Sequence, residues 1–578
     1  MGKFFVSVLA AGAVALVLGA CASTGRAGAA GVVTSLPKID MSRWSYNAAD
    51  DVYYQTGISY VAHPADTSYE TLGIYVPGAY FEASANGDGT YTARTKAGGK
   101  AGSYTVRNAP TVIPVETPGY SACKPPSGYT ADVKAFTDAG FIYLFAGCRG
   151  RTEGAPAGVT DLKAAIRYWR YNADILPGSS ERIFSFGMSG GGAQSALLGA
   201  TGNSALYEPY LKAIGAVEGV SDAVTGSMCW CPITNLDIAD AAYEWNMGAS
   251  RSGLSETEQM ISDKLAASFA AYINSIALVS EKGVPLTLEA SADGRWQAGS
   301  YYDYTKALIE DSLAKFLSDT EFPYNPSQTQ KAGMGGPGGF GGMPQGMPPM
   351  GMPGGNAGNG GYEQRDNIQR NNAAGGGLTL NGSYDSPQAY IDALNVDGTW
   401  VSYDAKSGRV SITSIADFAK KLKTASKSVG AFDDLNAQQG ENVLFGYGSG
   451  TGAHFDKYLA DIVKGTKYES AYSSDLKRSD KLGFSVQARL DMYTPLYYLN
   501  KTFGGYKSAD VAKHWRIRSG IFQGDTAVCT EMNLALALRA YGIKDVDFEA
   551  VWGQKHVKAE LQGDSTLNFI SWVNDCLK

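Results

Sequence analysis

The sequence predicts an α/β protein, in which helices flank a mostly parallel central sheet and a large, mainly helical segment is inserted into it. Short apolar runs alternate with helix-like runs between residues 71 and 210, and the same alternation returns after residue 514. The region between these two parts does not follow this rhythm. Strands that alternate with helices form parallel sheets, because a parallel connection has to cross over the sheet. A hydrophobic share of 44% is sufficient for a folded globular core.

Two parts of the chain build the predicted core, residues 43–244 and 481–578. In the first part we expect strands over residues 72–76, 111–115, 141–146 and 183–187, and helices over residues 129–139, 158–173 and 194–202. In the second part we expect strands over residues 515–519 and 545–551, a helix over residues 527–541 and a closing helix over residues 567–576.

Residues 245–480 form the predicted insertion, which we interpret as a lid. Helices are expected over residues 255–279, behind a capping box of Ser255 and Glu258, and over residues 301–317. Residues 331–377 are rich in Gly, Met and Pro, a composition that buries too little apolar surface to order the chain. We expect a disordered linker there. The alternative is a copper site of methionine thioethers, which the lack of interleaved His or Cys disfavours.

The N-terminus has the pattern of an export signal over residues 1–20. Lys3 precedes an apolar run that ends in small residues and is too short for a comfortable membrane span. The tripeptide Leu-Gly-Ala before Cys21 resembles a bacterial lipobox, which implies cleavage before Cys21 and lipid attachment to it; an ordinary signal peptide is the alternative. Residues 21–42 are a predicted flexible tether. We therefore expect a lipid-anchored protein of the bacterial cell envelope, on the outer-membrane, cell-surface or periplasmic side.

Charge and cysteine content limit the partners. A net charge of -7 provides no basic footprint for nucleic acid. Export permits disulfides, so the cysteines after Cys21 are either buried thiols or disulfide partners, and their pairing does not follow from the sequence. No histidine is near Cys229 and Cys231, which disfavours a metal site there.

Residues 187–191 (GMSGG) match the pattern G-x-S-x-G and lie between a predicted strand and a predicted helix. This arrangement is typical of a nucleophile elbow, in which flanking glycines permit a crowded turn that exposes the serine. It predicts Ser189 as a nucleophile. A phosphate-binding loop is excluded, because the segment lacks the lysine of that motif.

The base and the acid are predicted from their order along the chain. A serine needs an adjacent base, and on this fold the order is serine, acid, histidine. Of the four histidines, His556 follows the last predicted strand, and Asp525 lies in the loop after residues 515–519. Asp525 would orient the imidazole and stabilise its charged form. The alternatives are a helix cap for Asp525 and a surface position for His556.

Two backbone N–H groups should stabilise the oxyanion. The first is expected from Gly190, the residue after the nucleophile, and the second from the loop after an earlier strand. We expect that second donor near Tyr120 or Ser121, in the loop after residues 111–115. An ordinary Pro-Gly turn is the alternative.

These motifs resemble the bacterial tannase-like (subtype B) branch of the α/β-hydrolases, which includes tannin acyl hydrolases and feruloyl-esterase-like relatives. The matching stretches are residues 50–55, 71–80, 114–121, 154–171, 187–203, 231–245, 514–526 and 551–556. The resemblance implies an α/β-hydrolase fold with a lid inserted after the central strands, and an ester hydrolase with Ser189 as nucleophile and His556 as base. It also implies that the acid of the triad lies in the loop of residues 520–526. Some relatives have the acid two residues before Asp525, where this sequence has Gln523.

The predicted function is that of a serine carboxylic-ester hydrolase that forms an acyl-enzyme and needs no cofactor or metal. The resemblance implies aromatic esters, galloyl or feruloyl, as substrates, and implies that a lid Lys and a lid Glu hold galloyl hydroxyls, without placing them in this insertion. A peptidase or an esterase for simple acyl or acetyl esters is the first alternative. A catalytically silent binding lipoprotein is the second.

Overall fold

The computed structural model describes residues 32–326, 378, 380–423 and 425–578. The predicted export signal, the lipidation site at Cys21 and the predicted linker over residues 331–377 lie outside these residues.

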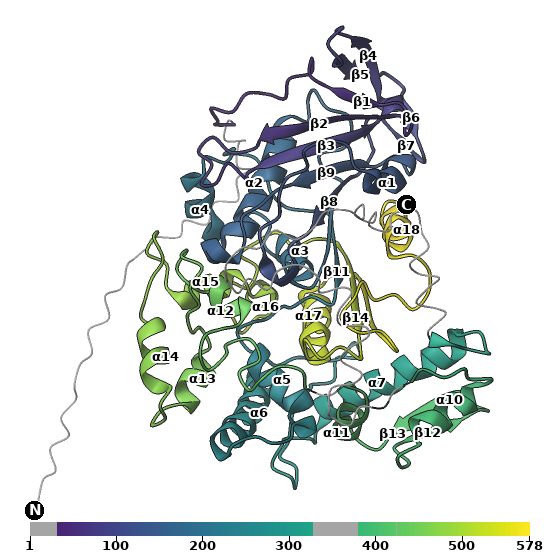
Figure 1. The fold of residues 1–578 in the computed structure, drawn as a ribbon, viewed down its shortest axis with the longest axis vertical. Coiled ribbons are helices and arrows are strands. Elements are labelled where there is room, and N and C mark those ends of the chain that lie inside the picture. The colour runs from purple at the N-terminus through teal and green to yellow at the C-terminus, as the bar shows by residue number, and fades with distance from the viewer. Residues whose placement is uncertain (1–31, 327–377, 379, 424) are drawn as a thin grey trace, which may run out of the picture.

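A central sheet dominates the described part of the chain, and its nine strands there have the order β1-β2-β3-β9-β8-β10-β11-β14-β15. The strands are β1 (Ser45–Asn47), β2 (Val52–Ser59), β3 (Thr71–Pro77), β8 (Thr111–Val115), β9 (Ile142–Ala146), β10 (Ile183–Met188), β11 (Gly226–Trp230), β14 (His514–Gly520) and β15 (Asp545–Val551). From β9 to β15 all neighbours are parallel, whereas β3 is antiparallel to both β2 and β9. The predicted fold class, a mostly parallel sheet flanked by helices, is confirmed (Figure 1).

Alternation of side chains along β10 explains how helices cover both faces of the sheet. Phe186 points to one face, where it stacks with Phe136 of α1 (Lys134–Asp138) and Phe569 of α18 (Ser565–Cys576). Ser185 points to the other face, and its hydroxyl lies 2.9 Å from that of Ser195 in α3 (Gly190–Ala200). On that face α2 (Ala157–Tyr171) packs beside α3, and α17 (Val528–Tyr541) packs against β14 and β15.

Most predicted elements end within a few residues of the observed ones, but three differences are clear. The segment predicted as a helix over residues 129–139 is a 3-10 turn, Ala131–Val133, followed by the short α1. Strand β11 was not predicted, because its apolar run is not followed directly by a helix. Also unpredicted were β1, β2 and the small hairpins β4 (Phe81–Ala85) with β5 (Tyr91–Thr95) and β6 (Lys100–Ala101) with β7 (Tyr104–Thr105).

Between β11 and β14 the described chain is mainly helical. The longest helices are α5 (Ala239–Met247), α6 (Glu256–Ile276) and α7 (Ser300–Asp319), and the predicted capping box of Ser255 and Glu258 begins α6. Shorter helices follow: α10 (Pro387–Leu394), α11 (Ile415–Phe418), α12 (Gly440–Leu444), α13 (Lys457–Ile462), α14 (Glu469–Asp475), α15 (Val486–Met492) and α16 (Pro495–Leu499). A hairpin of β12 (Val401–Asp404) and β13 (Arg409–Ile412) was not expected. The lid boundaries at residues 245 and 480 remain a prediction.

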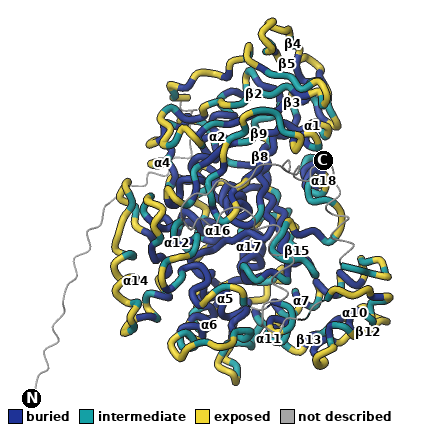
Figure 2. The backbone as a smooth tube through the Cα atoms, in the orientation of Figure 1, coloured by how far each residue is buried: buried dark blue, intermediate teal, exposed yellow. Residues whose placement is uncertain are grey.

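The sheet and the inserted helices share one apolar core. A single cluster of buried side chains runs from Leu36 to Val573 and includes residues of α5, α6 and α7. Figure 2 shows the buried backbone continuing from the sheet into α5, whose nine residues are all buried. The inserted helices are therefore packed onto the sheet domain as part of one body. Among the described helices, none has both the length and the hydropathy that crossing a membrane requires.

Candidate active site

Ser189 occupies a sharp turn between β10 and α3. Its φ of 61° and ψ of -124° are rare for a residue with a side chain and indicate a strained backbone. Backbone hydrogen bonds hold the turn, because Ser189 N donates to Trp230 O at 2.9 Å and Ile233 N donates to Ser189 O at 3.3 Å. The turn has the geometry predicted for a nucleophile elbow.

The flanking glycines are required by close backbone approaches. A Cβ on Gly187 would lie 2.5 Å from the carbonyl group of Gly191, and a Cβ on Gly191 would overlap the carbonyl oxygen of Val115. Larger residues at either position would push α3 away from β8 and β10. The G-x-S-x-G spacing thus reflects packing of the helix against two strands.

His556 reaches Ser189 from the loop after β15. Its Nε2 lies 2.7 Å from Ser189 Oγ, which is hydrogen-bond distance for a base and its nucleophile. Ser189 is only 7% exposed, so the pair is largely shielded from bulk water. The structure brings together the two residues that the sequence predicted as nucleophile and base.

The other imidazole nitrogen contacts Gln523, which corrects the expectation for Asp525. His556 Nδ1 lies 2.6 Å from Gln523 Oε1. The chain turns after β14, with Gln523 N donating to Gly520 O, and this turn directs the buried Gln523 side chain to the histidine. Asp525, two residues further on, is half-buried and interacts electrostatically with Lys423. Asp525 is the carboxylate of this loop and was predicted for that reason, but an amide oxygen can also accept from Nδ1–H.

Lys423, from the inserted region, is a buried cation near Asp525 that was not predicted from the sequence. It is 3% exposed, and within the described part of the chain its Nζ has no hydrogen-bond partner. Burial lowers the pKa of this ammonium to about 8, although the neighbouring Glu531, Cys529, Cys231 and Asp525 oppose the shift. Lysine is abundant in the insertion, so no sequence signal singles out this one.

Cys231 joins the loop that carries His556 to the loop that carries Gln523. Its Sγ accepts from Gly520 N at 3.3 Å and donates to Val557 O at 3.2 Å. Burial raises the pKa of the Cys231 thiol to about 12, so the thiol is neutral and inert. In the described chain, the six cysteines after Cys21 are free thiols rather than disulfides.

The oxyanion donors differ from expectation at the second position. Gly190 begins α3, where the first N–H groups of a helix have no intrahelical partner. The turn Pro118–Tyr120 lies against it, as expected. However, Tyr120 N donates to Thr117 O at 2.9 Å and Ser121 N to Pro118 O at 3.1 Å. The 3-10 turn thus uses both N–H groups that were predicted as free donors.

Possible ion-binding groups lie away from Ser189. Among the described residues, the side-chain donors of His514, Asp545 and Cys576 lie within 4.8 Å of one another. His514 and Asp545 begin β14 and β15, whereas Ser189 and His556 follow the ends of strands. This group therefore lies at the opposite edge of the sheet.

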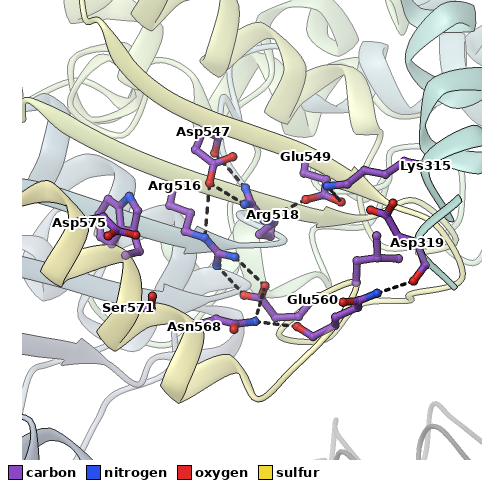
Figure 3. A pocket seen from close by; sticks show the side chains of 13 residues that line it. Lys315, Asp319, Arg516, Arg518, Asp547, Glu549, Glu560, Asn568, Ser571 and Asp575 are labelled. Carbon is purple, nitrogen blue, oxygen red and sulfur yellow. Dashed lines mark hydrogen bonds and ion pairs between the residues drawn. The ribbon is translucent and has the colours of Figure 1, made fainter. Parts of the chain in front are cut away.

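A polar pocket of about 350 Å³ lies beside β14, β15 and α18 (Figure 3). Its charged side chains pair with one another: Arg516 with Glu560 at 2.6 Å, Arg518 with Asp547 at 2.6 Å and Lys315 with Glu549 at 2.8 Å. Glu560 also accepts from Trp230 Nε1 at 2.9 Å. Because Glu560 follows His556 closely, these bonds anchor the histidine loop to β11 and β14.

Comparisons with known proteins show similarity to bacterial tannases. The BD-FAE family profile matches residues 104–293. The tannin acyl hydrolase of Lactobacillus plantarum has a TM-score of 0.65 and 26% identity, over 94% of this chain and 99% of that one. The Fusobacterium nucleatum tannase has a TM-score of 0.64 and 27% identity, over 91% of this chain and 95% of that one. A tannin acyl hydrolase in complex with ethyl gallate has a TM-score of 0.61 and 27% identity, over 91% and 94%.

No curated protein sequence matches the chain. The similarity to tannases nevertheless extends over more than nine tenths of it, at an identity of 25–27%. The fold and these comparisons identify the chain as a carboxylic ester hydrolase with the α/β-hydrolase fold, similar to bacterial tannases.

Proposed function

We propose that the protein hydrolyses esters with Ser189 as the nucleophile and His556 as the general base and acid. The observation that carries this proposal is the 2.7 Å contact between Ser189 Oγ and His556 Nε2 at a strained strand-to-helix turn. A buried serine hydroxyl on a strained turn beside an imidazole has the arrangement of an activated nucleophile.

The reaction proceeds by acyl transfer. Ser189 Oγ attacks the ester carbonyl while His556 Nε2 takes its proton, and Gly190 N–H stabilises the oxyanion. His556 then gives the proton to the departing alcohol, which leaves the acyl group on Ser189. Water repeats the sequence: His556 takes a proton from it, the hydroxide attacks the acyl carbonyl, and Ser189 regains its proton as the carboxylic acid departs.

We propose aromatic esters with ring hydroxyls as the substrates, as in the tannase-like subtype B branch. The similar tannin acyl hydrolases include complexes with ethyl gallate and with 3,4-dihydroxybenzoate. In this chain, Lys423 and Asp525 support the assignment. A buried ammonium that donates and a carboxylate that accepts suit phenolic hydroxyls, each of which does both.

The protein truncated before Cys21 is suited to a direct test, with Ser189→Ala as the blank. Initial rates are compared for methyl gallate, methyl ferulate and p-nitrophenyl acetate. Preference for methyl gallate supports a site that binds the hydroxyl groups of the substrate ring. Hydrolysis of p-nitrophenyl acetate alone supports the nucleophile and base but points to simple acyl esters. Absence of Ser189-dependent hydrolysis and of fluorophosphonate labelling points to a silent binding protein.

We further propose that Cys21 carries a lipid and holds the protein in the bacterial cell envelope. The lipobox-like sequence before Cys21 supports this proposal. Metabolic labelling with a fatty-acid analogue should tag the wild-type protein and leave Cys21→Ser unlabelled. Equal labelling of both proteins would contradict it.

A further inference from the structure

A buried hydrogen-bond chain continues behind His556. Gln523 Oε1 faces His556 Nδ1 at 2.6 Å, and Gln523 Nε2 lies 2.8 Å from Ser519 Oγ and 3.3 Å from Glu531 Oε1. A neutral amide thus occupies the place next to the histidine, and a carboxylate lies directly behind the amide.

Glu531 is held firmly in this position. It lies in the first turn of α17, where the helix dipole favours negative charge, and its side chain is completely buried. Thr526 Oγ1 donates to it at 2.7 Å and Thr530 Oγ1 at 3.0 Å. Burial is the largest effect and raises the pKa of Glu531 above its ordinary value, and these hydroxyls and the ammonium of Lys423 oppose that rise.

The carboxylate determines which way the Gln523 amide points. An amide has one accepting end and one donating end, and exchanging them would place its oxygen against the oxygens of Glu531. Glu531 therefore holds the NH₂ group toward itself and the oxygen toward His556. An accepting oxygen at Nδ1 requires a proton on Nδ1, which leaves Nε2 as the basic nitrogen facing Ser189.

We propose that Glu531 is a positioning residue that acts through Gln523 and supplies the negative charge that a carboxylate next to the histidine would supply. This role of Glu531 rests on the proposed serine esterase function. Glu531 fixes the amide, the amide fixes the imidazole tautomer, and the carboxylate stabilises the imidazolium across one intervening side chain.

Glu531→Gln tests the relay, with p-nitrophenyl acetate as a substrate that has no ring hydroxyl for Lys423 or Asp525 to bind. We expect kcat/KM to fall about 10- to 100-fold, less than the loss of roughly 10⁴ for an acid in direct contact with the histidine. In the pH profile of kcat/KM, the acid limb, where activity falls as His556 is protonated, should move to lower pH, because the imidazolium loses a nearby negative charge. The groups around Glu531 that also titrate or carry charge are Lys423, Asp525, Cys231 and Cys529.

The double variant Gln523→Glu with Glu531→Gln moves the carboxylate one step toward the histidine. We expect it to recover most of the lost kcat/KM and the original acid limb, which a merely structural role for Glu531 does not predict. Glu244→Gln is the matched control: this buried carboxylate lies in α5, pairs with Arg251, and should leave the pH profile in place.

Two outcomes overturn the relay while wild-type hydrolysis remains dependent on Ser189. One is a Glu531→Gln enzyme with unchanged kcat/KM and an unchanged acid limb. The other is a double variant with no recovery although thermal denaturation shows that it is folded. If the wild type itself shows no Ser189-dependent hydrolysis, the proposed function fails instead, so the two failures are distinguishable.

Discussion

Gly190→Ala tests the contact between the first turn of α3 and the turn Pro118–Tyr120. A Cβ on residue 190 would lie 2.5 Å from Tyr120 N, 2.7 Å from Thr117 O and 3.0 Å from Gly119 N. All three are backbone atoms, so no side-chain rotation relieves the overlap. Either the 118–120 turn or the start of α3 has to move, and that movement displaces the Gly190 N–H from the oxyanion.

The expected effect on activity is much larger than that on stability. Overpacking costs about 1–3 kcal/mol, and alanine offsets about 1 kcal/mol of this because it favours helix more than glycine does. The net destabilisation should stay below about 2 kcal/mol. Loss of one oxyanion donor lowers kcat about 10²- to 10³-fold.

The assay compares kcat on p-nitrophenyl acetate and the thermal midpoint of wild type, Gly190→Ala and Gly128→Ala. Gly128 is a matched control, since a Cβ there would meet no atom within 4 Å. The variants should also be labelled with a fluorophosphonate probe to follow Ser189 directly. If Gly190→Ala keeps kcat within a few-fold of wild type while remaining folded, the placement of the oxyanion site against this turn is wrong.

Three further predictions concern the loop, the lid and pH. Glu560→Ala removes the two short contacts of the buried Arg516 and leaves it the longer one to Asp547 at 3.6 Å, so the free energy of unfolding in denaturant melts should fall by about 3 kcal/mol. A change below about 1 kcal/mol would show that the loop is anchored otherwise. Lys423→Met should lower kcat/KM for methyl gallate about tenfold more than for p-nitrophenyl acetate, and equal losses on both would contradict a role in binding ring hydroxyls. Burial raises the pKa of Asp237 from 3.8 to about 6. The folded protein therefore binds this proton more tightly than the unfolded chain, and stability is lost as pH rises from about 4 to 6, by about 3 kcal/mol in all. Asp237→Asn should raise the thermal midpoint at pH 8 and change it little at pH 4, and an equal change at both would exclude this cause.

The sequence alone was enough for the fold class, and it singled out Ser189 and His556, the pair that the structure brings together. Ser189 is identifiable because its elbow is a local structure: the glycines at 187 and 191 are required by backbone contacts within a few residues of the turn and with the neighbouring strand. His556 is identifiable because the order of elements along the chain places the loop after β15 at the same sheet edge as Ser189.

Only the tertiary structure decided which groups complete the site. Whether Gln523 or Asp525 faces His556 depends on the direction of the turn after β14, in which Gln523 N donates to Gly520 O. The contributions of Lys423 and Glu531 depend on how the inserted region and α17 pack beside that loop. These contacts are single hydrogen bonds between segments that are distant in the chain. Their directions depend on how the segments pack, which residue type and spacing along the chain do not specify.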